Sequence, residues 1–291
     1  MRDPRFTGSG VALVTPFDDS GVNERVLRDL VRFHLREGTD ALVVCGSTGE
    51  AATMSPEEQR TAIEVVVSEC EGRLPVIAGC GGSDTLRVVE LAVQAREAGA
   101  DGLLVSAPPY NKPTQDGLIT HYRLVLEEAD LPVIVYNVPS RAGVNILPET
   151  IAELARDERV IGVKEASGDI AQVADLARLV GDRVAIWSGN DDQIVPLLSL
   201  GGRGVISVVA NVAPAETSRM VHHFLNGDIE RAMSLQLRYL PLIRALFAEP
   251  NPIPVKAAVE WLGFDVGPLR LPLTPPKPAT RERLFEAMRE I

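Results

Sequence analysis

The sequence predicts an α/β protein built as a (β/α)₈ barrel, the TIM-barrel architecture, with a C-terminal helical extension. Two observations favour this fold. Short apolar runs rich in valine and isoleucine recur along the chain, and segments with helical spacing of apolar residues separate them. The runs are almost continuously hydrophobic, which is typical of parallel strands covered on both faces. Eight such alternations fit a closed barrel better than an open sheet, which usually has fewer strands.

Eight strands are expected, at residues 11–17, 41–46, 74–80, 101–107, 131–138, 160–166, 184–189 and 204–211. Helical patterns between them include residues 55–70, 83–100 and 147–157. The first of these begins with a capping-box pattern: Ser55 is the N-cap, Pro56 takes the first helical position and Glu58 follows three residues after the serine. The second is expected to stop at Gly99, since glycine favours the end of a helix.

Residues 1–225 are expected to form the barrel, and residues 226–291 a helical extension packed on it. Helical patterns at 223–247 and 252–264 support the extension, and a proline-rich connection at 267–280 precedes a last helix. No flexible linker composition separates the two parts. One continuous body is therefore expected.

Composition limits the classes of partner. The 291 residues carry a formal net charge of -11, which disfavours nucleic acid and anionic membrane because both need a basic surface. No apolar run approaches the roughly 20 residues of a membrane span, and the N-terminus lacks the layout of a signal peptide, so a cytoplasmic location is expected. Cys45, Cys70 and Cys80 are too few and too far apart for a disulfide framework, and no CxxC or His-x-x-x-His pattern indicates a metal site, so they are expected to be reduced core thiols. A small-molecule partner is expected.

Lys164 is the first candidate for chemistry. Lysines number only four among 29 basic residues, so arginine supplies most of the positive charge. In barrels of this kind the C-terminal ends of the strands build the active site, which would place Lys164 in the barrel mouth. Desolvation there lowers the pKa of an amine and leaves a nucleophile that forms a Schiff base with a keto substrate. A surface lysine, or an ion pair with Glu165, is the alternative.

Other strand ends carry polar groups that suit this chemistry. Tyr136 ends the neighbouring strand and is a candidate for moving protons, although a buried aromatic filling the barrel is the alternative. Ser47 and Thr48 follow the second strand and offer hydroxyls for a proton relay. Arg141 lies five residues beyond Tyr136 and offers a bidentate fork to a carboxylate, unless it is an ordinary surface arginine.

Two other kinds of site are disfavoured. A phosphate site is suggested by the glycine-rich residues 201–204, but these precede the eighth strand, and Asp191 and Asp192 after the seventh strand would repel phosphate. A metal-dependent aldolase needs clustered ligands. The four histidines lie instead in helical segments: His34, His121, His222 and His223.

At these residues the chain resembles, end to end, the dihydrodipicolinate synthase and N-acetylneuraminate lyase family of Schiff-base barrels. The motifs that carry the resemblance are GSTGEAAT, YNVPSRAG, IGVKEASGD, GGRGVISVVAN and EPNPIPVK. YNVPSR with its arginine, together with EPNPIPVK, favours the synthase branch. The resemblance implies condensation of pyruvate with L-aspartate 4-semialdehyde in lysine and diaminopimelate biosynthesis. It implies no cofactor, only a covalent pyruvate imine.

The resemblance also assigns roles to matching residues. Lys164 would carry the imine, Tyr136 would act as general acid/base, and Arg141 would hold the carboxylate of the semialdehyde. The other matches form a relay and a backbone lining near pyruvate: Thr48 and Tyr110 for the relay, Gly189 and Ile206 for the lining. In the family the tyrosine matched by Tyr110 reaches the neighbouring subunit's site. A homo-oligomer, a dimer of dimers, is therefore expected.

Ser47 departs from most synthases, which have threonine there, and GSTGE also occurs in sialic acid lyases. A pyruvate-dependent lyase that cleaves a keto sugar acid therefore stays open, although Arg141 speaks against it because a sugar aldehyde lacks a carboxylate at that end. A non-catalytic barrel that binds a keto acid is a third possibility. The presence together of Lys164, Tyr136, Thr48, Tyr110 and Arg141 disfavours it.

Feedback-inhibited family members bind lysine between subunits. The matching positions here are Ala51, Pro56, Gln59, Ser83, Arg87 and Pro109. Arg87 stands in place of an acid and would repel the ammonium of lysine. No inhibition by lysine is expected.

Overall fold

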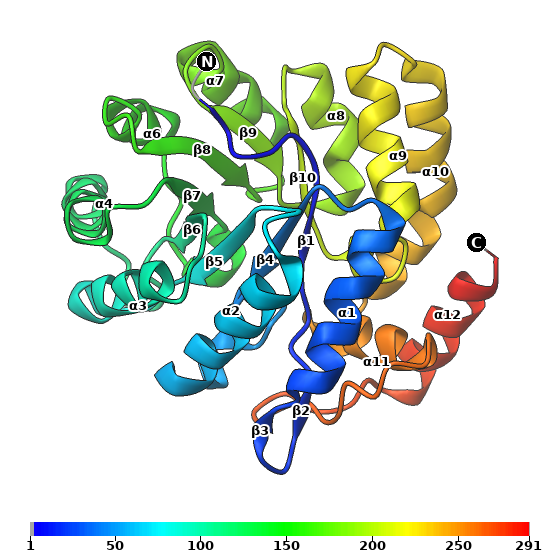
Figure 1. The fold of residues 1–291 in the computed structure, drawn as a ribbon. Helices are drawn as coiled ribbons and strands as arrows, with labels where there is room; N and C mark the ends of the chain where they lie inside the picture. The colour runs from blue at the N-terminus through cyan, green and yellow to red at the C-terminus, as the bar shows by residue number, and fades with distance from the viewer. Residues whose placement is uncertain (1–2, 291) are drawn as a thin grey trace.

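The centre of the molecule is a closed barrel of parallel strands, seen in the computed structural model, which describes residues 3–290 (Figure 1). The strands run in this order around the barrel: β1 (Gly8–Ala12), β10 (Gly204–Ser207), β9 (Ala185–Ser188), β8 (Val160–Glu165), β7 (Val133–Asn137), β6 (Gly102–Ser106), β5 (Val76–Cys80) and β4 (Ala41–Val44), which pairs with β1. Within the described residues these are eight strands, and the predicted (β/α)₈ fold is confirmed.

Helices surround the barrel and continue beyond it. Those between and after the strands are α1 (Glu24–Glu37), α2 (Pro56–Cys70), α3 (Thr85–Glu97), α4 (Gln115–Ala129), α5 (Pro139–Ala142), α6 (Pro148–Leu154), α7 (Ile170–Val180), α8 (Ile194–Ser199) and α9 (Pro214–Leu225). Short 3₁₀ helices are η1 (Ala51–Thr53), η2 (Asp191–Gln193) and η3 (Val209–Asn211). Because helices cover the strands, most strand residues are buried on both faces, which explains their unbroken hydrophobicity.

The capping box predicted at the start of α2 is confirmed. The Ser55 hydroxyl accepts from the backbone N–H of Glu58 at 3.2 Å, and the Glu58 carboxylate accepts from the backbone N–H of Ser55 at 2.9 Å. Pro56 occupies the first turn, where its missing N–H costs no hydrogen bond. At the end of α3, Gly99 adopts a φ of 89°, so the expected stop is also present.

The first strand was predicted at residues 11–17, but it lies earlier in the chain, at Gly8–Ala12 (β1). The glycines of β1 interrupt the apolar pattern on which the prediction depends. Gly8 has a φ of 108°, and a side-chain carbon there would collide with the carboxylate of Asp40. Glycine is therefore required where β1 passes close to the loop before β4.

The predicted eighth strand, residues 204–211, ends earlier, at Ser207. Side chains take the backbone N–H groups that a longer strand would use. The carboxylate of Asp191 accepts from Val208 and Val209, and the hydroxyl of Ser207 accepts from Ala210. The chain turns into η3 at that point.

Two apolar layers make up most of the core, and a smaller third cluster lies between β10, α8 and α9. The outer layer lies between the strands and the helices. It includes Cys45, Cys70 and Cys80, which are free and buried, as the sequence predicts. The inner layer fills the barrel, where the rings of Phe6 and Trp187 stack with centroids 4.8 Å apart. Tyr136 and Ile206 belong to this inner layer. The barrel is therefore a packed core rather than a channel.

Beyond the barrel, the chain forms α10 (Ile229–Leu246), α11 (Ile253–Trp261) and α12 (Pro278–Arg289). Residues 223–247, predicted as helical, divide between the end of α9 and α10, and the Asp228 side chain caps α10. Figure 1 shows α10 beside α9, and the hairpin of β2 (Phe17–Asp18) and β3 (Gly21–Val22) beside the segment after α11. A hydrogen bond from Phe17 N to Val266 O, 3.0 Å long, joins that hairpin to the segment.

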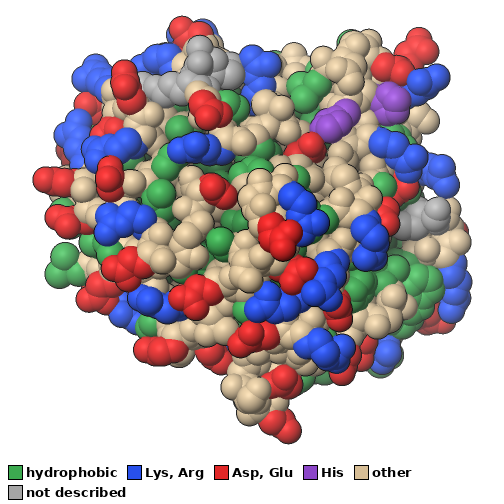
Figure 2. Space-filling view, viewed as in Figure 1, with side chains coloured by type: hydrophobic (Ala, Val, Ile, Leu, Met, Phe, Trp, Pro, Cys, Tyr) green, Lys and Arg blue, Asp and Glu red, His purple; other side chains and the backbone are tan. Residues whose placement is uncertain are grey.

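Acidic and basic side chains are interspersed over the face shown in Figure 2. Ion pairs at the surface of the described residues include Arg32 with Glu69 and Arg123 with Glu153. Within residues 3–290 no helix is both long enough and apolar enough to span a bilayer.

Candidate active site

Lys164 lies at the carboxyl end of β8, with its side chain in the interior. It is 6% exposed, and its neighbours in register are Tyr136 on β7 and Trp187 on β9. The amine lies 4.5 Å from the centre of the Tyr136 ring. Gly189, which follows β9, leaves room for the lysine stem, because a Cβ there would approach Lys164 Cε to 3.1 Å.

The charge state of Lys164 is perturbed. Burial lowers its pKa to about 7; the nearby Asp191 carboxylate opposes this shift and the Arg141 guanidinium adds to it. A lysine with such a pKa is partly neutral near pH 7, and a neutral amine is a nucleophile. Within residues 3–290 its amine takes part in no side-chain hydrogen bond or ion pair within bonding distance, so it is held by packing.

Glu165 does not form the ion pair that was the alternative role for Lys164. Successive strand residues point to opposite faces, and the Glu165 carboxylate accepts hydrogen bonds from Asn137 Nδ2, Gln172 Nε2 and the backbone of Ser167. These bonds tie the end of β8 to β7 and to α7. They hold the two strand ends that carry Lys164 and Tyr136 in one register.

Tyr136 is almost buried beside the amine. Burial raises its pKa to about 12, while the Arg141 guanidinium opposes the shift. The phenol therefore keeps its proton at neutral pH and is able to donate it. Within residues 3–290 no hydrogen bond joins its hydroxyl to Thr48 or Tyr110, so the relay predicted from the resemblance is not connected within one chain.

The loop after β4 presents its two hydroxyls differently. Ser47 is exposed, whereas Thr48 is buried and its hydroxyl accepts from Asn251 Nδ2 at 2.9 Å. Tyr110 lies on another loop, is 91% exposed and has a φ of 72°. Its backbone N–H donates to Ala142 O at 3.3 Å, which places the loop next to α5.

Arg141 lies on α5, at the same end of the barrel. One of its nitrogens, Nη2, donates to the backbone carbonyl of Asn251 at 2.8 Å. Asn251 therefore contacts two predicted site residues, Thr48 through its side chain and Arg141 through its carbonyl. Its own Oδ1 is buried without a partner in the described part of the chain.

Asn251 is not among the residues predicted from the sequence, although it lies in the motif EPNPIPVK. Asp191 was noted only as a residue that would repel phosphate. The remaining predicted residues are Gly189, beside the lysine stem, and Ile206, fully buried on β10. In residues 3–290 no group of three or more His, Cys, Asp or Glu side chains is placed to hold a metal ion.

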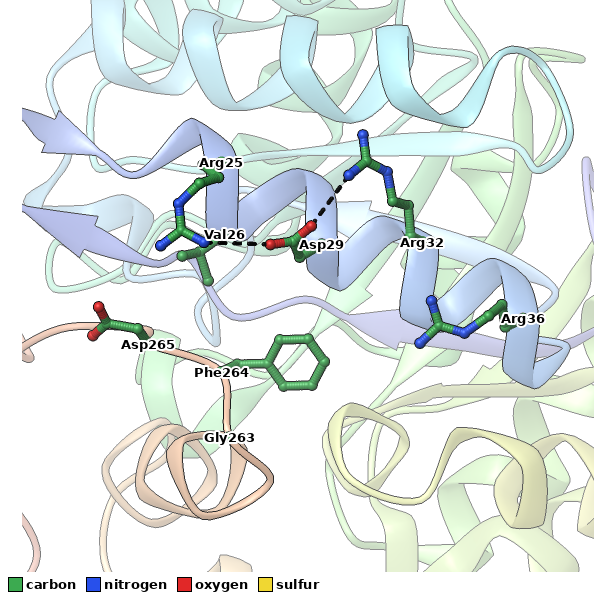
Figure 3. Close-up of a pocket in the computed structure, with 8 residues that line it drawn as sticks. All are labelled: Arg25, Val26, Asp29, Arg32, Arg36, Gly263, Phe264 and Asp265. Carbon is green, nitrogen blue, oxygen red and sulfur yellow. Dashed lines mark hydrogen bonds and ion pairs between the residues drawn. The ribbon is translucent and has the colours of Figure 1, made fainter.

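A separate surface groove of about 340 Å³ lies between α1 and residues 263–265 (Figure 3). Its lining is Arg25, Val26, Asp29, Arg32, Arg36, Gly263, Phe264 and Asp265. Asp29 pairs with Arg25 at 3.6 Å and with Arg32 at 3.2 Å. Since α1 lies outside the barrel and the groove holds no nucleophile, the cluster around Lys164 is the candidate active site.

Known proteins that resemble this chain in sequence and in structure carry the name of one enzyme. The chain is 55% identical to the 4-hydroxy-tetrahydrodipicolinate synthase of Thermoanaerobacter sp. (strain X514) over 271 residues, which covers 93% of this chain and 91% of the relative. It resembles a monomeric dihydrodipicolinate synthase variant with a TM-score of 0.97 and 42% identity, over 100% of this chain and 99% of that one. It also resembles the chloride-inhibited dihydrodipicolinate synthase of Acinetobacter baumannii complexed with pyruvate, with a TM-score of 0.95 and 40% identity, over 98% of both chains.

Fold and site together define a (β/α)₈-barrel protein with a buried, partly neutral lysine at a strand end. The model of the dihydrodipicolinate synthetase family matches residues 5–291. The chain belongs to this family.

Proposed function

We propose that the chain is a Schiff-base lyase that condenses pyruvate with L-aspartate 4-semialdehyde to 4-hydroxy-tetrahydrodipicolinate. The observation that carries the proposal is the buried amine of Lys164, whose pKa is lowered to about 7, beside the protonated phenol of Tyr136. Relatives named for this activity support the choice of substrates.

The chemistry starts with attack of the neutral Lys164 Nζ on the keto carbon of pyruvate. The carbonyl oxygen leaves as water once it has gained protons, and the nitrogen becomes an iminium. Loss of a proton from the methyl carbon then gives an enamine, because the iminium accepts the electron pair. Tyr136 is placed to pass protons in these steps.

The enamine carbon next attacks the aldehyde carbon, whose oxygen takes up a proton. The amino nitrogen of the semialdehyde then attacks the imine carbon and displaces Lys164, which closes the ring and restores the enzyme. No external redox or group-transfer cofactor enters this sequence of bonds. Arg141 is assigned to the carboxylate of the semialdehyde, and Ser47, Thr48, Gly189 and Ile206 to the surroundings of pyruvate.

Tyr110 is assigned to the site of a neighbouring subunit. Its side chain is 91% exposed, yet its loop is hydrogen bonded to α5, which carries Arg141. A dimer as the minimal active unit, and a dimer of dimers as the assembly, follow from this assignment. Mixing Tyr110→Phe and Lys164→Ala proteins, each inactive alone, is expected to restore activity after subunit exchange. Complete inactivity of the exchanged mixture, with exchange verified, would count against a shared site.

The decisive experiment is borohydride reduction with labelled pyruvate and peptide mapping, beside an assay with L-aspartate 4-semialdehyde. Label on Lys164 together with turnover is the expected result, and a Lys277→Ala protein, which lacks an exposed lysine, should be labelled in the same way. Label on Lys164 without turnover would overturn the substrate and direct the search to keto sugar acids. A protein that takes up no label on Lys164 would overturn the Schiff-base chemistry itself.

A further inference from the structure

Asp191 is a buried carboxylate at the active-site end of the barrel. It begins η2, three residues after the end of β9, and is 1% exposed. Its neighbour in sequence, Asp192, is exposed. The two aspartates therefore have different surroundings, and only the first faces the interior.

The position of Asp191 is held from two sides. Its Oδ2 accepts from the backbone N–H groups of Val208 at 3.0 Å and Val209 at 2.8 Å. Its carbonyl accepts from Gln236 Nε2 on α10 at 2.9 Å, and Gln236 Oε1 accepts in turn from Val195 N. A carboxylate fixed by these bonds cannot swing out to water without breaking them.

The second oxygen, Oδ1, is different. It is buried and has no hydrogen-bond partner of normal geometry within residues 3–290, although the Ser207 hydroxyl also acts on this carboxylate. An unpaired buried carboxylate oxygen is costly, so structural need alone does not explain an aspartate here. Asparagine would accept the same two N–H bonds without the cost of a buried charge.

Lys164 is the cation among the groups that act on Asp191, although its effect on the Asp191 pKa is smaller than those of burial and the hydrogen bonds. The lysine stem lies against Gly189, two residues before the aspartate, and Asp191 favours the protonated amine. Burial raises the pKa of Asp191 to about 6, while the hydroxyl of Ser207, the N–H groups from the end of β10 and the charge of Lys164 oppose this. The other groups acting on Lys164 are the cation of Arg141 and the neutral phenol of Tyr136.

We infer that Asp191 is a positioning residue that acts on the reaction through Lys164, as the counter-charge of the iminium formed there. The inference rests on the proposed function only as far as imine formation with a keto acid. Neutral Lys164 and pyruvate carry no charge at the new bond, whereas the iminium is cationic in a desolvated place. One proton is taken up as the oxygen leaves as water, and the Asp191 carboxylate balances the charge that remains.

The test compares Asp191→Asn with the matched control Asp192→Asn, since both remove one acidic charge but only the first removes it from the interior. Without the carboxylate the ammonium of Lys164 is less stable. The acid limb of the pH profile for borohydride trapping of pyruvate should therefore move down by about one pH unit. The iminium also loses its counter-charge, and the pyruvate concentration for half-maximal trapping at pH 8 should rise about tenfold.

The lower acid limb raises activity at low pH, whereas the higher half-saturating concentration of pyruvate lowers it. A purely structural role of Asp191 would produce neither change. Asp192→Asn should leave both quantities as in the unmodified protein. If Asp191→Asn matches Asp192→Asn in profile and half-saturation while its melting temperature is unchanged, the inference is wrong.

A second measurement needs no variant and covers the case in which Asp191→Asn does not fold. Infrared spectra of the unmodified protein, recorded as a function of pH with and without pyruvate, should show the ionisation of a buried carboxyl group moving to lower pH when pyruvate is added. An unchanged ionisation of this carboxyl group, with trapping on Lys164 verified in the same sample, would overturn the inference. Failure of trapping itself would overturn the proposed function instead, and trapping without turnover of the semialdehyde would overturn only the substrate.

Discussion

The ammonium of Lys256 lies 2.7 Å from Oε1 of Glu50, although 206 positions separate the two residues. Their side chains are 3% and 1% exposed. The same ammonium donates to Pro268 O, and the backbone N–H of Arg270 donates to the other oxygen of Glu50. The helical extension therefore holds the loop that carries Ser47 and Thr48, since Glu50 is part of that loop.

Replacing Lys256 by methionine is expected to lower the free energy of unfolding by about 3–5 kcal/mol, because it leaves a buried carboxylate without its charged partner. Urea unfolding at pH 7 measures this, with Lys277→Met as the control for loss of an exposed lysine. The double variant Glu50→Gln/Lys256→Met should recover part of the loss. An equal loss in the single and double variants would show that the ion pair is not the cause.

The contact between Asn251 and Thr48 gives a second prediction. Asn251→Ala removes the donor to the Thr48 hydroxyl but keeps the backbone carbonyl that Arg141 binds. A hydrogen bond of this kind contributes about 1 kcal/mol, so the rate of imine trapping should fall about five- to tenfold. The KM for the semialdehyde should change little. Asn226→Ala, at an exposed position, is the control, and a change confined to the semialdehyde KM would contradict the assignment.

Residues at strand ends could be placed from the sequence because parallel strands finish at one end of a barrel. This is why Lys164 and Tyr136 were expected close together, and their register pairing on β7 and β8 agrees. The limits of β1 could not be found in this way, because packing against Asp40 requires glycine at Gly8, where an apolar pattern is absent. Local sequence patterns therefore predict the strands that carry the site better than they predict the contacts that hold it.

The contacts that hold the site come from distant parts of the chain. Asn251 and Lys256 contact residues about 200 positions earlier, and no local periodicity reports such contacts. Asp191 has the same residue type as Asp192, so only the fold separates a buried carboxylate from an exposed one. Long-range hydrogen bonds and burial are properties of the folded chain. The spacing of residues in the sequence does not predict them.

Activity should depend on pH through the amine of Lys164. Its pKa is lowered to about 7, and only the neutral amine attacks, so the rate of imine formation should rise as pH increases through about 7. At pH 6 it should be about a tenth of its plateau value. The Tyr136 phenol, with a pKa raised to about 12, should cause no alkaline decline near pH 9. Initial rates of trapping across this range measure the profile; one that is flat between pH 6 and about 8 would rule out titration of Lys164.

Gly189→Ala tests the room around the lysine stem. The added carbon would lie 2.6 Å from Ala166 Cβ and 3.1 Å from Lys164 Cε, so neighbouring atoms must shift. A displacement of about 1 Å at the nucleophile is expected to reduce kcat/KM about 100-fold. Gly82→Ala, where the nearest atom is Val88 Cγ2 at 3.4 Å, is the control. Full activity of Gly189→Ala would mean that the lysine adapts without loss.

L-Lysine at millimolar concentration should not inhibit the enzyme. The positions that match the family's lysine site already bond to one another: Gln59 Nε2 donates to Ala51 O at 3.0 Å, and Ser83 Oγ donates to Pro109 O at 2.9 Å. Arg87 forms an exposed ion pair with Glu90, which weakens the predicted repulsion of an ammonium. Initial rates with and without L-lysine, at pyruvate concentrations near KM, measure the effect. Inhibition at millimolar lysine would show that a lysine site forms from other residues.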